Sequence, residues 1–209
     1  MEPDLLEIAD QMRALATTGL HYAENDFDRN RYDELMRLAA RLAALQEGGD
    51  PREIERIYRR ADEGYVTPKL DVRMAIFRRD RILLIKERVD SRWAMPGGFV
   101  DIGDSPSDAA VRETAEEAGL EVRARRLVGV FDCRLQPESS SHLFHIHKII
   151  FTGEPLDSRV EPTAQGETTD ARFYALNELP ELSLGRTLPL HIREAKRVAD
   201  DPSELPYFD

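Results

Sequence analysis

The stretch of sequence that decides the fold is PGGFVDIGDSPSDAAVRETAEEAGL, residues 96–120. A glycine pair and a polar loop lead to Ser105, a residue type that caps helix N-termini, and Pro106 follows at the first helical position. Gly119 supplies the left-handed residue that ends many helices. The spacing therefore predicts a helix over about residues 106–118. At 3.6 residues per turn, this helix carries three carboxylates on one face, those of Glu113, Glu116 and Glu117.

Three like charges on one helix face repel each other unless a cation lies between them. Hard divalent cations such as Mg²⁺ bind one or two carboxylates together with waters and substrate phosphates. The small residues Gly97 and Gly98 allow the backbone to approach a ligand closely and leave a carbonyl free to coordinate. Together these features suit hydrolysis of a diphosphate. An isolated acidic cluster would instead be interpreted as an ordinary solvated helix face.

The flanking spacing favours the metal site. The segment resembles the box of the Nudix hydrolases, Gly-x5-Glu-x7-Arg-Glu-x-x-Glu-Glu-x-Gly followed by an apolar residue. Six fixed positions agree, which random sequence would produce roughly once in 10⁷ starts; they are Gly98, Arg112, Glu113, Glu116, Glu117 and Gly119. The resemblance covers residues 69–200. Asp104 stands where most members have Glu, and Thr114 stands where an aliphatic residue is usual.

The resemblance implies a pyrophosphohydrolase that depends on Mg²⁺, with Mn²⁺ as a substitute. Glu113, Glu116 and Glu117 would bind the metal together with the Gly97 carbonyl, and Arg112 would orient Glu113, which makes Glu113 and Arg112 part of the catalytic set. Family members often draw one more carboxylate from a loop outside the box. Glu167 is predicted to be this ligand or general base, with Glu161 and Glu154 as rivals.

Residues 1–66 are predicted to form a small all-helical domain and residues 67–209 the Nudix domain. Apolar stripes at steps of three and four indicate two helices; they are Leu5, Ile8, Met12 and Leu15, then Leu35, Leu38, Leu42 and Leu45. Residues 18–22 are predicted as a loop between them, Asp28 as a cap, and Pro51 as the start of a third helix. Residues 64–68 would form the linker.

From Lys69 onward the texture is that of strands around one or two helices, which predicts an α/β (α+β) fold, the Nudix α/β/α sandwich. The expected strands cover residues 70–77 and 82–85, joined by a turn near residues 79–80, and then residues 126–133, 143–152 and 171–176. A closing helix is predicted over residues 187–200.

The N-terminal half carries a second resemblance. Residues 18–22, 27–32 and 100–106 are similar to the branch that contains bacterial CDP-choline pyrophosphatases and ADP-ribose pyrophosphatase-like proteins, which has a small helical domain before the Nudix domain. His145 and Lys148 match polar positions on a strand of that branch, so either is a candidate for binding substrate. The alternative is that they are half-buried strand residues.

The composition limits the kinds of partner that this protein can have. The formal charge is 29 minus 40, or −11, which argues against nucleic-acid binding based on charge alone. No apolar run exceeds four residues, which excludes a membrane span, and the acidic start lacks a signal peptide, so we expect a cytoplasmic protein. Cys133 is the sole cysteine.

The leading hypothesis is hydrolysis of a nucleoside diphosphate linked to another group, of CDP-choline or ADP-ribose type, by a homodimer assembled through the N-terminal helices. Two alternatives are a catalytically weak ligand-sensing or interaction module and an RNA-directed nuclease or decapping activity. The complete Arg112-Glu113-x-x-Glu116-Glu117 set argues against the first, and the acidic charge argues against the second.

Overall fold

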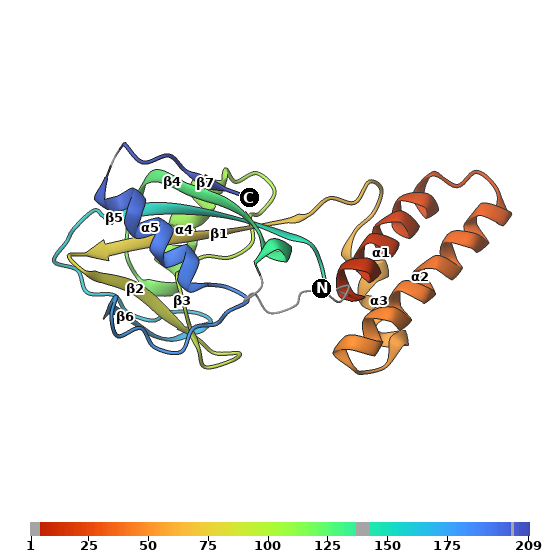
Figure 1. Ribbon diagram of the computed structural model, residues 1–209, viewed down its shortest axis with the longest axis horizontal. Coiled ribbons are helices and arrows are strands. Elements are labelled where there is room, and N and C mark those ends of the chain that lie inside the picture. The colour runs from red at the N-terminus through yellow and green to blue at the C-terminus, as the bar shows by residue number, and fades with distance from the viewer. Residues whose placement is uncertain (1–4, 137–142, 202) are drawn as a thin grey trace. The chain divides into compact units, whose positions relative to one another are not determined.

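The computed structural model describes residues 5–136, 143–201 and 203–209, which divide into two compact units (Figure 1). The first unit contains the described residues up to Lys69 together with residues 143–145. The second contains the described residues from Leu70 to 136 and from Ile146 to Asp209. None of the helices in these ranges is both long and apolar enough to cross a membrane.

The first unit is built from three helices, α1 (Leu5–Tyr22), α2 (Asp26–Glu47) and α3 (Pro51–Ala61). The loop predicted at residues 18–22 was wrong, because α1 continues to Tyr22. The cap predicted at Asp28 was also wrong. Asn25 caps α2, since its side-chain oxygen accepts a hydrogen bond from the backbone N–H of Asp28 at 2.9 Å. The predicted start at Pro51 is confirmed, with Asp50 as the cap.

Alanines dominate the core of this unit. Small side chains let α1 and α2 approach closely, so the helices pack on alanine-rich faces. Of the predicted stripes, Met12, Leu35 and Leu42 are partly buried against this core. The stripe residues Ile8, Leu15, Leu38 and Leu45 are exposed. The buried core residues are Leu6, Ala9, Ala16, Met36, Ala39, Ala40, Ala43, Ile54 and Tyr58.

Arg13 ties residues 143–145 to the helices of the first unit. Its guanidinium is buried between the rings of Tyr58 and Phe144, 5.6 and 4.9 Å from their centroids. Carboxylates neutralise it, with Arg13 Nε 2.7 Å from Asp10 Oδ1. Asp10 also accepts the backbone N–H of His145 at 2.8 Å. A buried guanidinium paired in this way fixes both the ring of Phe144 and the backbone of His145.

In the second unit the described strands form a seven-stranded mixed sheet of order β3-β2-β1-β5-β4-β7, with β6 paired to β2. The helices α4 (Pro106–Ala118) and α5 (Pro189–Asp200) and the short 3₁₀ turn Cys133–Leu135 complete this unit. The strands are β1 (Lys69–Arg78), β2 (Arg81–Glu87), β3 (Trp93–Ala94), β4 (Val122–Asp132), β5 (Ile146–Pro155), β6 (Thr168–Ala175) and β7 (Tyr207–Phe208).

The two helices cover opposite faces of the sheet, which confirms the predicted α/β/α sandwich (Figure 1). Successive side chains of a strand point to opposite faces. Accordingly Met74 packs in the cluster that contains Ala109 and Ala110 of α4, whereas the next residue, Ala75, packs in the cluster that contains Ile192 of α5.

The predicted hairpin is confirmed, since β1 and β2 are antiparallel and joined at residues 79–80. The predicted strand over residues 143–152 is shifted, because β5 begins at Ile146 and His145 lies before it. The closing helix begins at Pro189 rather than at residue 187, as expected for a proline, which fits only the first turn of a helix.

Candidate active site

The helix α4 carries the carboxylates and has the predicted bounds. Ser105 accepts the backbone N–H of Asp108 at 3.2 Å, and Gly119 ends the helix with φ at 63°. Thr114, the unusual residue in the box, is fully buried and donates its hydroxyl to the carbonyl of Ala110 at 2.7 Å. The hydroxyl is therefore satisfied within the helix. The presence of Thr114 in place of the usual aliphatic residue leaves no buried polar group unpaired.

A cavity of about 480 Å³ opens beside α4 in the second unit. The glycine loop, the carboxylate face of α4, the ends of β1 and β2 and two later loops all contribute to its wall. The lining residues are Asp71, Arg73, Glu87, Gly97, Gly98, Phe99, Glu113, Glu116, Glu117, Gly166, Glu167 and Arg186.

The glycine loop is clamped between β1 and α4. The backbone N–H of Val72 donates to the Gly98 carbonyl at 2.8 Å, and that of Met74 donates to the Pro96 carbonyl at 2.9 Å. The intervening Gly97 carbonyl takes no part in this pairing, while its N–H donates to Glu117 Oε2 at 2.8 Å. The Gly97 φ is 144°, and a Cβ there would lie 2.0 Å from the Val72 carbonyl oxygen. Only glycine fits this position.

Arg112 organises the exposed side of the carboxylate face. Its Nη1 lies 2.9 Å from Glu113 Oε1 and 3.1 Å from Glu116 Oε2. Its Nε lies 3.2 Å from Asp104 Oδ2. The shorter acid at position 104 therefore still reaches the arginine, and Arg112 holds Glu113 in place.

Burial dominates the electrostatics of the cavity. It raises the pKa of Glu117 to about 7, against the opposing effects of the Gly97 N–H and of Arg73. Burial also raises the pKa of Glu113, although Arg112 opposes this. Both shifts mean that these carboxylates lack sufficient positive charge nearby.

The formal charge of the lining residues likewise indicates a shortage of positive charge in the cavity. It contains the two guanidinium groups of Arg73 and Arg186 and six carboxylates, so the formal balance is 2 minus 6, or −4. Carboxylates together with a backbone carbonyl form the hard oxygen set that Mg²⁺ prefers. The donor set fits a divalent cation.

Among the three candidate acids outside the box, Glu167 lines the cavity. Glu161 forms an ion pair with Arg78 at 2.8 Å, and Glu154 pairs with Arg125 at 3.4 Å. Neither contributes to the described lining. The structure thus brings Glu167 together with the box carboxylates.

The structure does not bring Lys148 to the cavity. Lys148 is 2% exposed, and its Nζ lies 2.6 Å from Asp71 Oδ1. Asp71 also binds Arg73, which is buried and whose Nη2 lies 2.7 Å from Asp71 Oδ2. Lys148 therefore neutralises the carboxylate of Asp71 from within the buried core and does not face a ligand. The other candidate, His145, belongs to the first unit.

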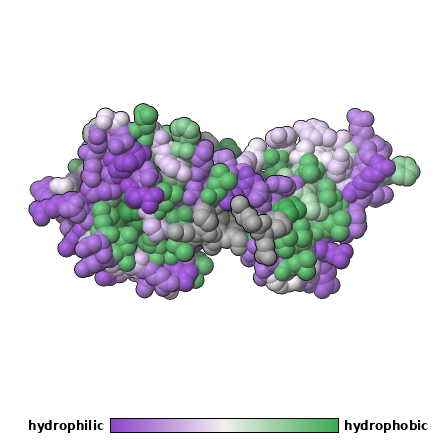
Figure 2. All heavy atoms as spheres, in the orientation of Figure 1, coloured by the Kyte–Doolittle hydropathy of each residue, from purple (hydrophilic) through white to green (hydrophobic). Residues whose placement is uncertain are grey.

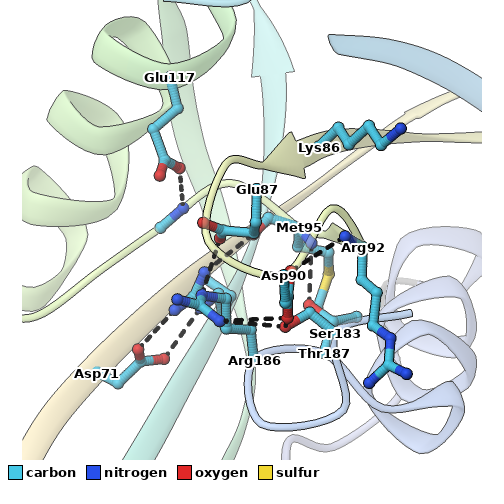
Figure 3. A network of polar contacts seen from close by, with 12 residues as sticks. Asp71, Lys86, Glu87, Asp90, Arg92, Met95, Glu117, Ser183, Arg186 and Thr187 are labelled. Atoms are coloured by element: carbon cyan, nitrogen blue, oxygen red, sulfur yellow. Dashed lines mark hydrogen bonds and ion pairs between the residues drawn. The ribbon is translucent and has the colours of Figure 1, made fainter. Parts of the chain in front are cut away.

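Sequence analysis missed Glu87 and Arg186, which also line the cavity (Figure 3). Arg186 Nε lies 2.9 Å from Glu87 Oε1, and Arg186 Nη1 is 3.2 Å from Ser183 Oγ. Ser183 in turn donates to Asp90 Oδ2 at 2.7 Å. The two residues are about a hundred positions apart in the sequence, so no local spacing pairs them.

The sandwich fold and the carboxylate helix beside a glycine loop define a Nudix hydrolase, and the NUDIX domain family matches residues 67–195. The chain belongs to this family. Residues 3–58 match the UDP-X-like, N-terminal oligomerisation domain.

Relatives match over the whole chain as well as over the Nudix domain. YjhB of Bacillus subtilis, which is provisionally named an ADP-ribose pyrophosphatase, is 35% identical over 98% of this chain and 96% of its own length. The crystal structure of a UDP-X diphosphatase is 29% identical, with a TM-score of 0.62 over 99% of this chain and 98% of that one. An ADP-ribose pyrophosphatase from Streptococcus suis is 34% identical, with a TM-score of 0.61 over 68% of this chain and all of its own.

Proposed function

We propose that this Nudix hydrolase cleaves the diphosphate of a nucleoside diphosphate linked to a second group, releasing a nucleoside monophosphate and a phosphorylated product. The observation that carries the proposal is the cavity in which Glu113, Glu116 and Glu117 of one helix face meet the Gly97 loop and Glu167. A complete ligand set argues against a catalytically weak binding module.

The charge of this cavity argues for a divalent cation, which we propose to be Mg²⁺, with Mn²⁺ as a substitute. A lining of formal charge −4 repels a diphosphate anion, so a substrate of this class binds only with cations. Glu113, Glu116, Glu117 and the Gly97 carbonyl would hold the metal. A divalent cation at such a site neutralises phosphate charge and makes the attacking water more acidic.

The chain's own residues then have separate tasks. Arg112 keeps Glu113 and Glu116 oriented, since it contacts both carboxylates. The Gly97 N–H fixes the carboxylate of Glu117. Glu167, on a loop outside the helix, would orient the attacking water or accept its proton, as a general base within hydrogen-bond reach does.

For the second group of the substrate, the names of two relatives specify ribose, and that of a third leaves the group linked to UDP open. ADP-ribose and a series of compounds linked to UDP are therefore the first to test, followed by CDP-choline. The decisive experiment is a hydrolysis screen with and without MgCl₂, with nucleoside monophosphate release as the readout and with capped RNA as the alternative substrate. Release from capped RNA alone would contradict the proposal.

We also propose that the protein is a homodimer assembled through the first unit. Ile8, Leu15 and Tyr22 lie seven residues apart on α1, and all three are exposed. Leu38 and Leu45 repeat the same spacing on α2. Figure 2 shows hydrophobic side chains at the surface of this unit beside polar ones. The match of residues 3–58 to an oligomerisation domain supports this assignment.

A further inference from the structure

Arg186 is held in the cavity wall by groups that leave part of its guanidinium unused. Its Nε pairs with the buried Glu87 at 2.9 Å, and its Nη1 contacts Ser183 at 3.2 Å and Asp90 at 3.7 Å. Within the described ranges, the hydrogen bond and ion pairs of Arg186 engage Nε and Nη1. Arg186 is one-third exposed, so the side chain is held at Nε and Nη1 and remains partly open.

The second arginine of the lining differs in this respect. Arg73 is 4% exposed, and its Nε and Nη2 both bond to Asp71. Its Nη1 donates to the Met95 carbonyl at 3.2 Å. Each of its three nitrogens therefore has a partner within the wall. Of the two guanidinium groups that line the cavity, that of Arg186 retains donors for a ligand.

The support behind Arg186 comes from three parts of the chain. Glu87 ends β2, Asp90 belongs to the turn that follows it, and Ser183 belongs to the segment before α5. Figure 3 shows these side chains gathered around the guanidinium, whereas the side chain of Arg92, on the same turn, points away. Arg92 pairs instead with Glu181 at 2.8 Å.

We propose that Arg186, which lines the cavity, binds a phosphate oxygen of the substrate diphosphate through the exposed part of its guanidinium, and that Glu87, Ser183 and Asp90 are positioning residues that orient it. The inference rests on the proposed function, and it names a recognition element outside the Nudix box. A guanidinium whose Nε pairs with a carboxylate can still offer N–H donors of its Nη groups to a phosphate, because its five donors point in fixed directions in one plane. Arg186 thereby adds positive charge to a lining in which carboxylates predominate.

The test is the affinity of the full-length protein for ADP in the presence of MgCl₂, measured by titration calorimetry, since binding needs no turnover. Arg186→Met should weaken ADP about 10- to 100-fold, the effect of losing a charged hydrogen bond. Arg186→Lys keeps a positive charge beside Glu87 but presents one nitrogen, so it should also weaken ADP by about tenfold. Arg92→Met, the matched control, should bind ADP like the wild type. Wild-type affinity in Arg186→Met would overturn the proposal.

A double-mutant cycle tests the positioning role. Glu87→Gln should weaken ADP several-fold in the wild-type background and change nothing in the Arg186→Met background, because Glu87 acts through the arginine. Equal effects of Glu87→Gln in both backgrounds would show that Glu87 does not act through Arg186 and would overturn its positioning role.

The outcomes also separate this inference from the proposed function. A wild type that hydrolyses nucleoside diphosphate derivatives while both Arg186 variants bind ADP normally would refute the role of Arg186 and leave the function standing. A wild type whose ADP affinity depends on Arg186 but which cleaves no such compound would refute the function and leave the phosphate contact standing. A wild type that neither binds a nucleoside diphosphate nor cleaves any of its derivatives would refute both.

Discussion

At the scale of single residues, the carboxylate of Glu117 lies where the α4 helix and the glycine loop meet, bonded to the Gly97 N–H at 2.8 Å. Glu117→Gln keeps the size of the side chain and an oxygen for that bond but removes the charge. We expect kcat to fall by several orders of magnitude, because transition-state stabilisation by a metal is worth several kcal/mol. Steady-state kinetics at saturating MgCl₂ test this, with the exposed Glu154→Gln as control. Near-wild-type turnover would exclude Glu117 from the metal site.

The raised pKa of Glu117 predicts a pH-dependent metal requirement. With a pKa of about 7 in the metal-free protein, this carboxyl is mostly protonated at pH 6 and mostly ionised at pH 8. A metal must displace the proton, so its apparent affinity should be about tenfold weaker at pH 6 than at pH 8. The Mg²⁺ concentration that gives half-maximal activity measures this. A constant value across the range would contradict the prediction.

The third prediction concerns Glu167, which lines the cavity from a loop outside the box. If it orients or deprotonates the attacking water, Glu167→Gln should lower kcat about 100-fold or more and leave KM nearly unchanged, since the group acts mainly in the transition state. Glu161→Gln and Glu154→Gln are matched controls, because both acids pair with arginines elsewhere. A larger defect in either control would reassign the base.

Residues in one short segment could be predicted, whereas residues joined by the fold could not. The carboxylates of α4 and Gly97 share a local pattern, and the structure places all of them on one cavity. Glu87 and Arg186 form their ion pair across a long stretch of chain, and neither lies in a recognisable motif. Lys148 matched a polar strand position, yet alternation along β5 buries it against Asp71.

At the scale of elements, cap chemistry predicted α4 better than apolar periodicity predicted α1 and α2. Ser105 and Gly119 act through local hydrogen bonds and backbone conformation, so their effect does not depend on neighbouring helices. The faces that α1 and α2 bury depend on how closely the two helices approach. Alanines permit a close approach, and weighting leucines alone therefore rotates the predicted faces, so that Met12, Leu35 and Leu42 pack against the real core while the other leucines of the stripes do not.

The helix α5 offers a stability test through His191, which is 2% exposed. Its Nδ1 accepts the backbone N–H of Leu188 at 3.1 Å, and its ring packs edge-on against Phe131. Burial lowers the pKa of His191 to about 3, with Lys148 and Arg73 contributing in the same direction and Asp71 opposing them. The folded protein therefore holds this imidazole neutral well below the pH at which an unfolded histidine takes up its proton.

The direction in which stability changes with pH follows from proton uptake by the unfolded chain. Between the unfolded pKa of 6.5 and the folded value of about 3, the unfolded chain binds the extra proton, so stability falls as pH falls through this window. At pH 5 the loss from this one group should be about 2 kcal/mol relative to pH 7.5. His191→Asn retains an acceptor for Leu188 and does not titrate. Urea unfolding of both proteins at pH 7.5 and 5 should show a drop smaller by about 2 kcal/mol in the variant, and equal drops would contradict the assignment.

At the scale of the whole molecule, the sequence predicted two parts but not the membership of residues 143–145 in the helical one. This segment lies about 130 residues from the α1 residues it meets, and only the buried Arg13 with its partners makes it part of that core. Contacts between residues so far apart in the sequence depend on the complete fold, and no local pattern in residues 143–145 predicts them. An N-terminal truncation would strip Phe144 of its partners, so surface variants of the full chain are the better probe of assembly.

The last prediction is that the full-length protein is a dimer that depends on exposed leucines of α1 and α2. At 100° per residue, Leu15 and Leu45 lie on the sides of their helices opposite the buried faces, where they are 64% and 76% exposed. A helix that is apolar on both sides needs a second partner, and a symmetric copy of the same surface is the commonest one. Leu15→Glu combined with Leu45→Glu places charges at that surface and should shift the mass from light scattering to that of the monomer. Val89→Glu, a matched change at a residue 84% exposed in the second unit, should leave the dimer intact. A wild type that is monomeric, or a double variant that remains dimeric, would show that these leucines do not form the interface.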